Sequence, residues 1–239
     1  MWQAAGEVEF LTLPITGRDS SSRPKFLLGR IPIRATSPKD KPPHNSTLPP
    51  LCDPIEVANF STAKRYEEHL AGRFLLAAIL EEWGIECSGI EIQRDQYRAP
   101  SLSWLASPQF VKPLPNISIG HSQDWAVAAI CERSHRIGID AEPVDRHISK
   151  SAFPFMASGE ELVLLNGQSD LALMMWTAKE AVQKALGLGM NLNPRHISCD
   201  WWRLKEKSRV NMQLNGYSTE IETWQFGDLC LSLALAITT

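Results

Sequence analysis

The side chains in this sequence that are best suited to chemistry begin with two carboxylates, Asp140 and Glu142. Apolar and polar residues alternate around them, which predicts a β-strand over residues 137–142. Side chains two apart on a strand point to the same face, so both carboxylates would lie opposite Ile139. Neighbouring carboxylates repel each other unless a cation is bound between them, and Mg²⁺ binds few carboxylates together with water and substrate phosphate. For an isolated pair of this kind, a solvated strand end would be the better interpretation.

A second set of functional side chains is predicted on a helix over residues 171–186. Trp176, Glu180 and Lys184 are spaced four residues apart and share one face of that helix. Gly187 follows at the position of a C-cap glycine. A surface ion pair would explain the glutamate and the lysine but not the tryptophan. With the first segment, this helix indicates three carboxylates around one hard metal ion and a lysine beside them, which suits chemistry on a pyrophosphate.

The two segments together resemble a known family. Gly-Ile-Asp-x-Glu, followed about 35 to 40 residues later by Trp-Thr-x-Lys-Glu-Ala-x-x-Lys, is similar to the pattern of the 4′-phosphopantetheinyl transferases, specifically their monomeric surfactin type. Between them, residues 155–162 resemble the family's Phe…Glu-Glu-Leu helix start, with Ser158 as the N-cap. Upstream, residues 117–122 resemble its Ser-Ile-Ser-His-Ser strand end, and Arg65 and Arg73 resemble an arginine pair on one of its helices.

The chain departs from the family pattern in two places. Gly120 stands where the family has a serine before its histidine. Tyr97-Arg98-Ala99-Pro100 stands where the family has a Gly-Lys-Pro or Gly-Arg-Pro loop, so Arg98 would supply the basic side chain from one position earlier. Both departures concern coenzyme A binding and leave the acidic residues intact.

The resemblance implies an enzyme that transfers the 4′-phosphopantetheine arm of coenzyme A to a serine of an acyl or peptidyl carrier protein and releases adenosine 3′,5′-bisphosphate. It implies Mg²⁺, with Mn²⁺ as the other candidate, on Asp140, Glu142 and Glu180. Glu180 would also take the serine proton, and Lys184 would neutralise or protonate the leaving phosphate. The implied contacts to coenzyme A are made by Arg65, Arg73, Arg98, Pro100, Ser118, His121 and Lys184.

The carrier protein would dock between the two acidic segments, over about residues 144–175. Phe153, Phe155 and Met156 are candidates for an apolar docking patch there.

A faint internal repeat predicts an α+β fold. In each half a helix is followed by antiparallel strands, and the resemblance implies a pseudo-dimer of two such subdomains with the active site in the cleft between them. We expect an N-terminal subdomain over residues 1–133, including a proline-rich loop at 38–54, and a C-terminal subdomain over 134–239. The helices are predicted at 61–83, 159–165 and 171–186. The strands are predicted at 7–15, 26–33, 90–94, 116–120, 126–131, 137–142, 198–203, 209–214, 219–225 and 229–237.

The composition argues against several other classes of protein. A net charge of −3 gives no electrostatic case for binding nucleic acid. The five cysteines form no C-x-x-C pair, which favours reduced thiols in a cytosolic protein. The longest apolar run, at 229–237, is too short to span a bilayer, and the first residues have no signal-peptide pattern. We therefore expect a soluble, cytoplasmic protein without a membrane or nucleic-acid partner, and the resemblance implies a monomer.

Two other functions stay open at this level. The chain could be a relative that only binds coenzyme A or carrier protein, although such a protein has no physical need for three converging carboxylates. It could also be an Mg²⁺-dependent phosphohydrolase, which would act without a carrier protein. His121 could be an ordinary hydrogen-bonded histidine at a strand end, and Arg65 a solvated helix residue.

Overall fold

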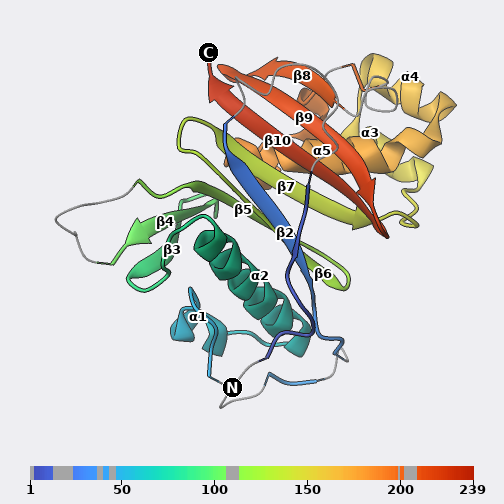
Figure 1. The fold of residues 1–239 in the computed structure, drawn as a ribbon. Helices are drawn as coiled ribbons and strands as arrows, with labels where there is room; N and C mark the ends of the chain where they lie inside the picture. Colours follow the sequence, from blue (N-terminus) through green and yellow to red (C-terminus); the bar gives the residue numbers. More distant parts are fainter. Residues whose placement is uncertain are drawn as a thin grey trace.

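The structure is a computed structural model that describes residues 3–12, 24–36, 40–42, 47–105, 113–198, 200–201 and 209–239. Two four-stranded antiparallel sheets pack face to face, and a long helix covers the outer side of each sheet (Figure 1). This confirms the expected α+β class. The relation of the two halves as a pseudo-dimer, and the domain boundary at 133/134, stay predictions.

The first sheet is formed by the N-terminal part of the chain and has the strand order β1-β2-β6-β5. Its strands are β1 (Glu9–Phe10), β2 (Phe26–Pro32), β5 (Asn116–Ser122) and β6 (Trp125–Cys131). Helix α2 (Ala63–Glu82) packs on its outer face, where its leucines and Ile79 are almost fully buried. The side chain of Thr62 caps the first turn of α2. The chain leaves α2 at Gly84, whose φ of 84° suits a glycine C-cap.

The second sheet is formed by the C-terminal part of the chain and has the strand order β7-β10-β9-β8. Its strands are β7 (Arg136–Pro143), β8 (Arg209–Leu214), β9 (Tyr217–Phe226) and β10 (Leu229–Thr238). Helix α5 (Ala172–Ala185) packs on the outer face of this sheet. It ends in two capping bonds, from the N–H of Gly187 to Lys184 O (3.0 Å) and from the N–H of Leu188 to Gln183 O (3.1 Å), as the C-cap glycine predicts.

The alternation along β7 separates the core from the site. Ile137, Ile139 and Ala141 are buried between the two sheets. Asp140 and Glu142 therefore lie on the other face of the strand, toward α5, as the pattern predicts.

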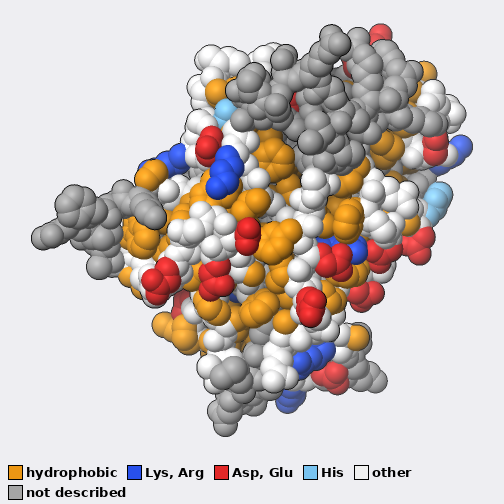
Figure 2. Space-filling view, in the orientation of Figure 1, with side chains coloured by type: hydrophobic (Ala, Val, Ile, Leu, Met, Phe, Trp, Pro, Cys, Tyr) orange, Lys and Arg blue, Asp and Glu red, His pale blue; other side chains and the backbone are white. Residues whose placement is uncertain are grey.

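Smaller elements complete the fold. They are α1 (Pro54–Ala58), the hairpin of β3 (Ile90–Arg94) and β4 (Pro100–Trp104), α3 (Phe153–Met156), α4 (Gly159–Gly167), and 3₁₀ turns at Lys150–Ala152, Ser169–Leu171, Gly189–Asn191 and Pro194–His196. On the face of the molecule in Figure 2, acidic and basic side chains are interspersed with apolar ones. Among the described residues, no helix combines the length and the apolar composition that crossing a membrane requires.

Some element predictions need correction. The expected loop at 38–54 ends in a helix, because Pro54 occupies the first turn of α1 and Asp53 caps it by accepting a hydrogen bond from Ile55 N (2.8 Å). Strand β4 was not predicted. Of the strand expected at 7–15, β1 covers Glu9–Phe10, and residues 13–15 lie outside the described residues. Of the strand expected at 198–203, residues 198, 200 and 201 are not in a strand, and the others lie outside the described residues.

Replacing Gly138 should prevent α5 from packing on β7. A Cβ atom at this position would lie 1.9 Å from Ala181 O and 2.5 Å from Ala185 N, which are backbone atoms of α5 that cannot turn aside. We expect Gly138→Ala to lower the free energy of unfolding by about 3 kcal/mol or more. Gly167→Ala is the matched control, since a Cβ atom there would meet nothing within 4 Å. Equal urea midpoints for the two variants would contradict this account of the packing.

Candidate active site

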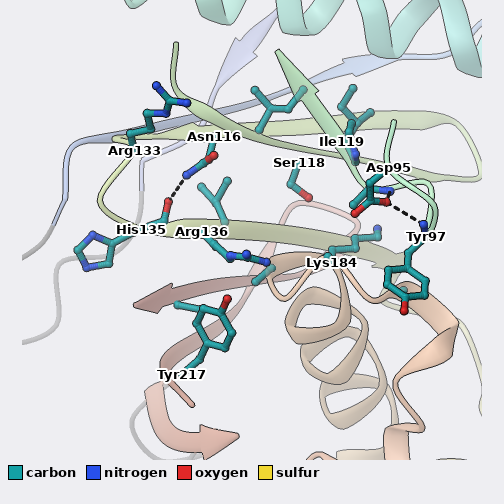
Figure 3. A pocket seen from close by; sticks show the side chains of 18 of the residues that line it. Asp95, Tyr97, Asn116, Ser118, Ile119, Arg133, His135, Arg136, Lys184 and Tyr217 are labelled. Carbon is teal, nitrogen blue, oxygen red and sulfur yellow. Dashed lines mark hydrogen bonds between the residues drawn. The ribbon is translucent and has the colours of Figure 1, made fainter. Parts of the chain in front are cut away.

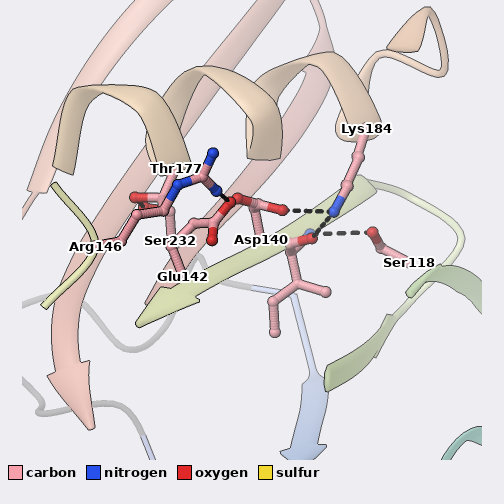
Figure 4. Close-up of polar contacts among 8 residues, drawn as sticks. Ser118, Asp140, Glu142, Arg146, Thr177, Lys184 and Ser232 are labelled. Carbon is pink, nitrogen blue, oxygen red and sulfur yellow. Dashed lines mark hydrogen bonds and ion pairs between the residues drawn. The ribbon is translucent and has the colours of Figure 1, made fainter. Parts of the chain in front are cut away.

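Asp140 and Lys184 form the centre of the site. Lys184 Nζ donates to Asp140 Oδ1 at 2.7 Å and to Ile139 O at 3.0 Å (Figure 4). Asp140 is 4% exposed, and its second carboxylate oxygen, Oδ2, is buried without a hydrogen-bond partner among the described residues. Ser118 Oγ accepts a hydrogen bond from Ile139 N at 3.0 Å, which ties the first sheet to the strand that carries the aspartate.

Glu180 lies one helical turn before Lys184 and is half-buried. Its burial, and next the negative charge of Asp140, raise the pKa of Glu180 from 4.5 to about 7, although the charge of Lys184 acts in the opposite direction. The two carboxyl groups are therefore close enough to repel each other. A bound cation would relieve this repulsion.

Glu142 is on the same face of β7 but is paired with Arg146 (Figure 4). Within the described ranges, no group of three or more His, Cys, Asp or Glu side chains has an arrangement that could hold a metal ion. A divalent cation between Asp140 and Glu180 would nevertheless account for two observations. It would bind Asp140 Oδ2, which has no hydrogen-bond partner among the described residues, and it would offset the repulsion that raises the pKa of Glu180. Glu142 would have to leave Arg146 to join them.

A pocket of about 470 Å³ lies between the two halves next to Lys184 (Figure 3). The first half contributes the β3–β4 turn and the start of β5, and the second half contributes the start of β7, the end of α5 and Tyr217. Arg136 donates to Leu186 O at 3.0 Å, and its guanidinium carbon lies 5.0 Å from the centroid of the Tyr217 ring. The polar lining suits a large, charged ligand.

The β3–β4 turn is fixed by one aspartate. Asp95 Oδ1 accepts hydrogen bonds from the backbone N–H of Tyr97 (2.8 Å) and of Ala99 (2.9 Å). Arg98, between them, has a φ of 66°. Arg98 and Pro100 line the large pocket and also a second, smaller one, so this turn lies at the boundary of the two.

The second pocket has a volume of about 170 Å³ and a basic lining. It brings together the predicted Arg73 of α2 and His121 of β5, and it adds His69 and Arg94, which were not predicted. Gly72 makes this approach possible, because a Cβ atom there would lie 3.0 Å from His121 Nε2. Spacing could have indicated His69, which is four residues before Arg73 on one face of the helix.

The histidines of the basic pocket are neutral at pH 7. Burial, and next the charge of Arg73, lower the pKa of His69 to about 4. His121 is exposed as a residue, but burial of its ring within the pocket, and next the charge of Lys184, also lower its pKa. The positive charge of the pocket therefore comes from its arginines.

Comparison with known proteins agrees with the resemblance seen in the sequence. Residues 136–236 match the sequence model of the 4′-phosphopantetheinyl transferase superfamily. The matched segment covers less than half of the chain. It contains Asp140, Glu142, Glu180 and Lys184.

Two relatives carry informative names. The chain is 25% identical over 203 residues to the L-aminoadipate-semialdehyde dehydrogenase-phosphopantetheinyl transferase of Xenopus laevis. The aligned region covers 73% of this chain and 62% of the relative. It is 35% identical over 79 residues to the 4′-phosphopantetheinyl transferase gsp of Aneurinibacillus migulanus. That alignment covers 31% of this chain and 32% of the relative. The chain thus spans less than two thirds of the length of either relative.

The structure does not bring every predicted side chain to the site. The side chain of Arg65 is 74% exposed, contacts Glu68 at 3.4 Å and lines neither of the two pockets. Gly120, where the transferase pattern has a serine, lies directly beside the lysine, since a Cβ atom there would be 3.1 Å from Lys184 Nζ.

The docking patch expected at 153–156 needs correction. Phe153 and Met156 are buried in the core of the second half, at 0% and 1% exposed, because the short helix α3 points them inward. Phe155 is 76% exposed and is the member of this set that a partner could contact.

The raised pKa of Glu180 predicts a pH-dependent difference in stability between wild type and Glu180→Gln, measured by urea unfolding with EDTA. The folded carboxyl, with a pKa of about 7, binds its proton more tightly than the unfolded one at 4.5. Its stabilising contribution is therefore complete below pH 4.5 and is lost as the pH rises to about 7. Glutamine does not titrate, so Glu180→Gln does not lose stability as the pH rises. Above pH 7 it should therefore be more stable than wild type by up to about 3 kcal/mol.

The control for this measurement is Glu160→Gln, at an exposed glutamate in the first turn of α4. It should not reproduce the gain in stability expected for Glu180→Gln, because its side chain lies at the exposed start of α4. A pH-independent difference for Glu180→Gln would contradict the burial of its carboxyl beside Asp140.

Proposed function

We propose that this protein transfers the 4′-phosphopantetheine arm of coenzyme A to a serine hydroxyl of a carrier protein in an Mg²⁺-dependent reaction. The observation that carries the proposal is the contact of Lys184 with Asp140 at 2.7 Å, beside a glutamate with a raised pKa. Lys184 lines the large polar pocket, and all three residues lie within the segment that matches the transferase superfamily.

In the proposed reaction the serine oxygen forms a bond to the β-phosphorus of coenzyme A, and the bond from this phosphorus to the bridging oxygen breaks. Adenosine 3′,5′-bisphosphate leaves with the electron pair of that bond. Glu180 would accept the serine proton. Lys184, whose side chain is 28% exposed, would offset the charge on the leaving phosphate.

Asp140 and Glu180, joined by Glu142, are the proposed ligands of Mg²⁺. When bound, the ion would offset the negative charge of the pyrophosphate oxygens.

The two pockets are the proposed site for coenzyme A. The pyrophosphate must lie near Lys184, which lines the large pocket. Arg98, which lines both pockets, would contact the ligand, and Arg73 and His121 would hold its second anionic group in the small one. Arginine suits this role because its planar fork binds phosphate in two places. Ser118 and Pro100 would then line the walls, and a role for Arg65 stays a prediction without support from its position.

The proposal is tested by intact-protein mass spectrometry of apo carrier proteins after incubation with the protein, coenzyme A and Mg²⁺. We expect the mass of one phosphopantetheine to be added to a carrier, and this addition to disappear with EDTA. Glu180→Gln should slow transfer by about 10²- to 10⁴-fold because the proton acceptor is lost, while the Glu160→Gln control stays active.

The other outcomes distinguish the alternatives. Binding of coenzyme A by calorimetry without transfer to any carrier would favour a protein that only binds. Cleavage of coenzyme A in the absence of a carrier would favour a phosphohydrolase. Near-normal turnover by Glu180→Gln would contradict its role as the base. The monomeric state and the cytoplasmic location stay predictions of the proposal.

Phe155 is the proposed apolar contact to the carrier protein. Because its side chain is 76% exposed, Phe155→Ala should leave the free energy of unfolding within about 0.5 kcal/mol of wild type and raise the KM for the carrier. Phe153→Ala, at a fully buried neighbour, should instead cost about 3–5 kcal/mol of stability. Ile55→Ala, at another residue that is 75% exposed, is the control for a general surface effect. An unchanged KM for Phe155→Ala would contradict the contact.

A further inference from the structure

The carboxylate of Glu56 contacts three of the basic side chains that line the small pocket. Glu56, on α1, pairs with Arg94 of β3 through its Oε1 atom. Its other oxygen, Oε2, lies 3.7 Å from Arg73 Nη2 and 3.9 Å from His69 Nε2 on α2. Helices α1 and α2 and strand β3 thus meet at Glu56.

The carboxylate contacts these groups from outside the pocket. Arg73, Arg94 and His69 are among the described residues that line the pocket of about 170 Å³, whereas Glu56 is not. Each basic side chain therefore has one side toward the carboxylate and another toward the space for a ligand. Arg73 Nε and His69 Nε2 are buried and have no hydrogen-bond partner among the described residues.

The arginines need a shared counter-ion to stay together. Burial, and next the positive charge of Arg94, lower the pKa of Arg73, which means that the two guanidinium groups repel each other. Arg73 is 4% exposed and enclosed by the fold, but the side chain of Arg94 is 33% exposed and could turn outward. Without the negative charge of Glu56, the repulsion would favour that outward position.

The charge of this cluster suits a phosphate monoester. Arg73, Arg94 and Arg98 bring three positive charges and Glu56 brings one negative charge, with the histidines neutral. A phosphate monoester carries about −1.5 to −2 at pH 7 and three acceptor oxygens. Coenzyme A has one such group, the 3′-phosphate. The pocket shares Arg98 with the larger pocket that reaches Lys184, so a ligand with two anionic groups could occupy both.

We propose that Glu56 is a positioning residue that holds Arg94 beside Arg73, and that this arrangement makes the small pocket selective for a phosphate monoester. The identification of the monoester as the 3′-phosphate of coenzyme A rests on the proposed function. Arg94 is then a further ligand-binding residue.

The test is the affinity for coenzyme A and for dephospho-coenzyme A, measured by calorimetry without a carrier protein. Wild type should bind coenzyme A at least about tenfold more tightly, because charge-assisted hydrogen bonds are lost with the 3′-phosphate. Glu56→Gln should weaken binding of coenzyme A by about 5- to 20-fold and leave binding of dephospho-coenzyme A within about twofold. Glu56→Asp, which keeps the charge, should recover part of the loss.

Two further variants complete the design. Arg94→Gln, at a partly exposed strand end, should reproduce the selective loss without depending on the packing of α1. Glu9→Gln is the matched control, since Glu9 pairs with Arg30 at 2.9 Å and lines neither pocket. It should bind both ligands like wild type.

Other results would contradict the proposed role of Glu56. Tighter binding of coenzyme A by Glu56→Gln would show that the carboxylate competes with the phosphate. An equal loss for both ligands would show a structural role only, and an unchanged preference would show that Glu56 does not position Arg94. In each of these cases the proposed transfer would stand if wild type binds coenzyme A. Failure of wild type to bind either ligand would overturn the proposed function together with the role of Glu56.

Discussion

The close contact of α5 with β7 at Gly138 is the constraint on which the site depends. The backbone of α5 at Ala181 occupies the space that a side chain at position 138 would need, so the helix lies directly against the strand. Asp140 is on the same face of β7, two residues further on, and Glu180 and Lys184 flank Ala181 on the helix. The ion pair between Asp140 and Lys184 therefore follows from the packing of two regular elements and requires no special loop.

The site has two chemically different parts. Beside Lys184, which lines the large pocket, burial and next the charge of Asp140 raise the pKa of Glu180, and a bound cation would relieve the repulsion between the two carboxyl groups. In the small pocket Arg73 and Arg94 repel each other, and Glu56 contacts both. The acidic part is carried by β7 and α5, and the basic part by α2 and β3, with Glu56 on α1. Because unlike charges lie in different parts, a ligand with two phosphate groups would have one preferred direction.

Periodic patterns in the sequence predicted the regular parts of the fold and of the site. The alternation along β7 and the spacing of four along α5 placed the carboxylates and Lys184 on facing surfaces, and the glycine after each long helix marked its end. The pairing of Glu142 with Arg146 was not predictable, because it depends on the path of the chain after the strand. Helix α1 and strand β4 were missed, since such short elements are stabilised by tertiary contacts. Glu56 lies on α1, whereas Arg94 lies on β3, which was predicted.

Two lysines on α5 show why a sequence pattern alone does not assign roles. Lys179 is fully buried, and its ammonium group donates to Glu161 Oε2, Met156 O and Pro194 O at 2.7–2.9 Å. An ammonium group has three N–H donors, so Lys179 has none left for a ligand, and its role is to join α5 to α3 and α4. Lys184 uses two donors within the described residues, and its side chain is 28% exposed at the pocket. Only the second lysine has both a donor and the access that contact with a phosphate requires.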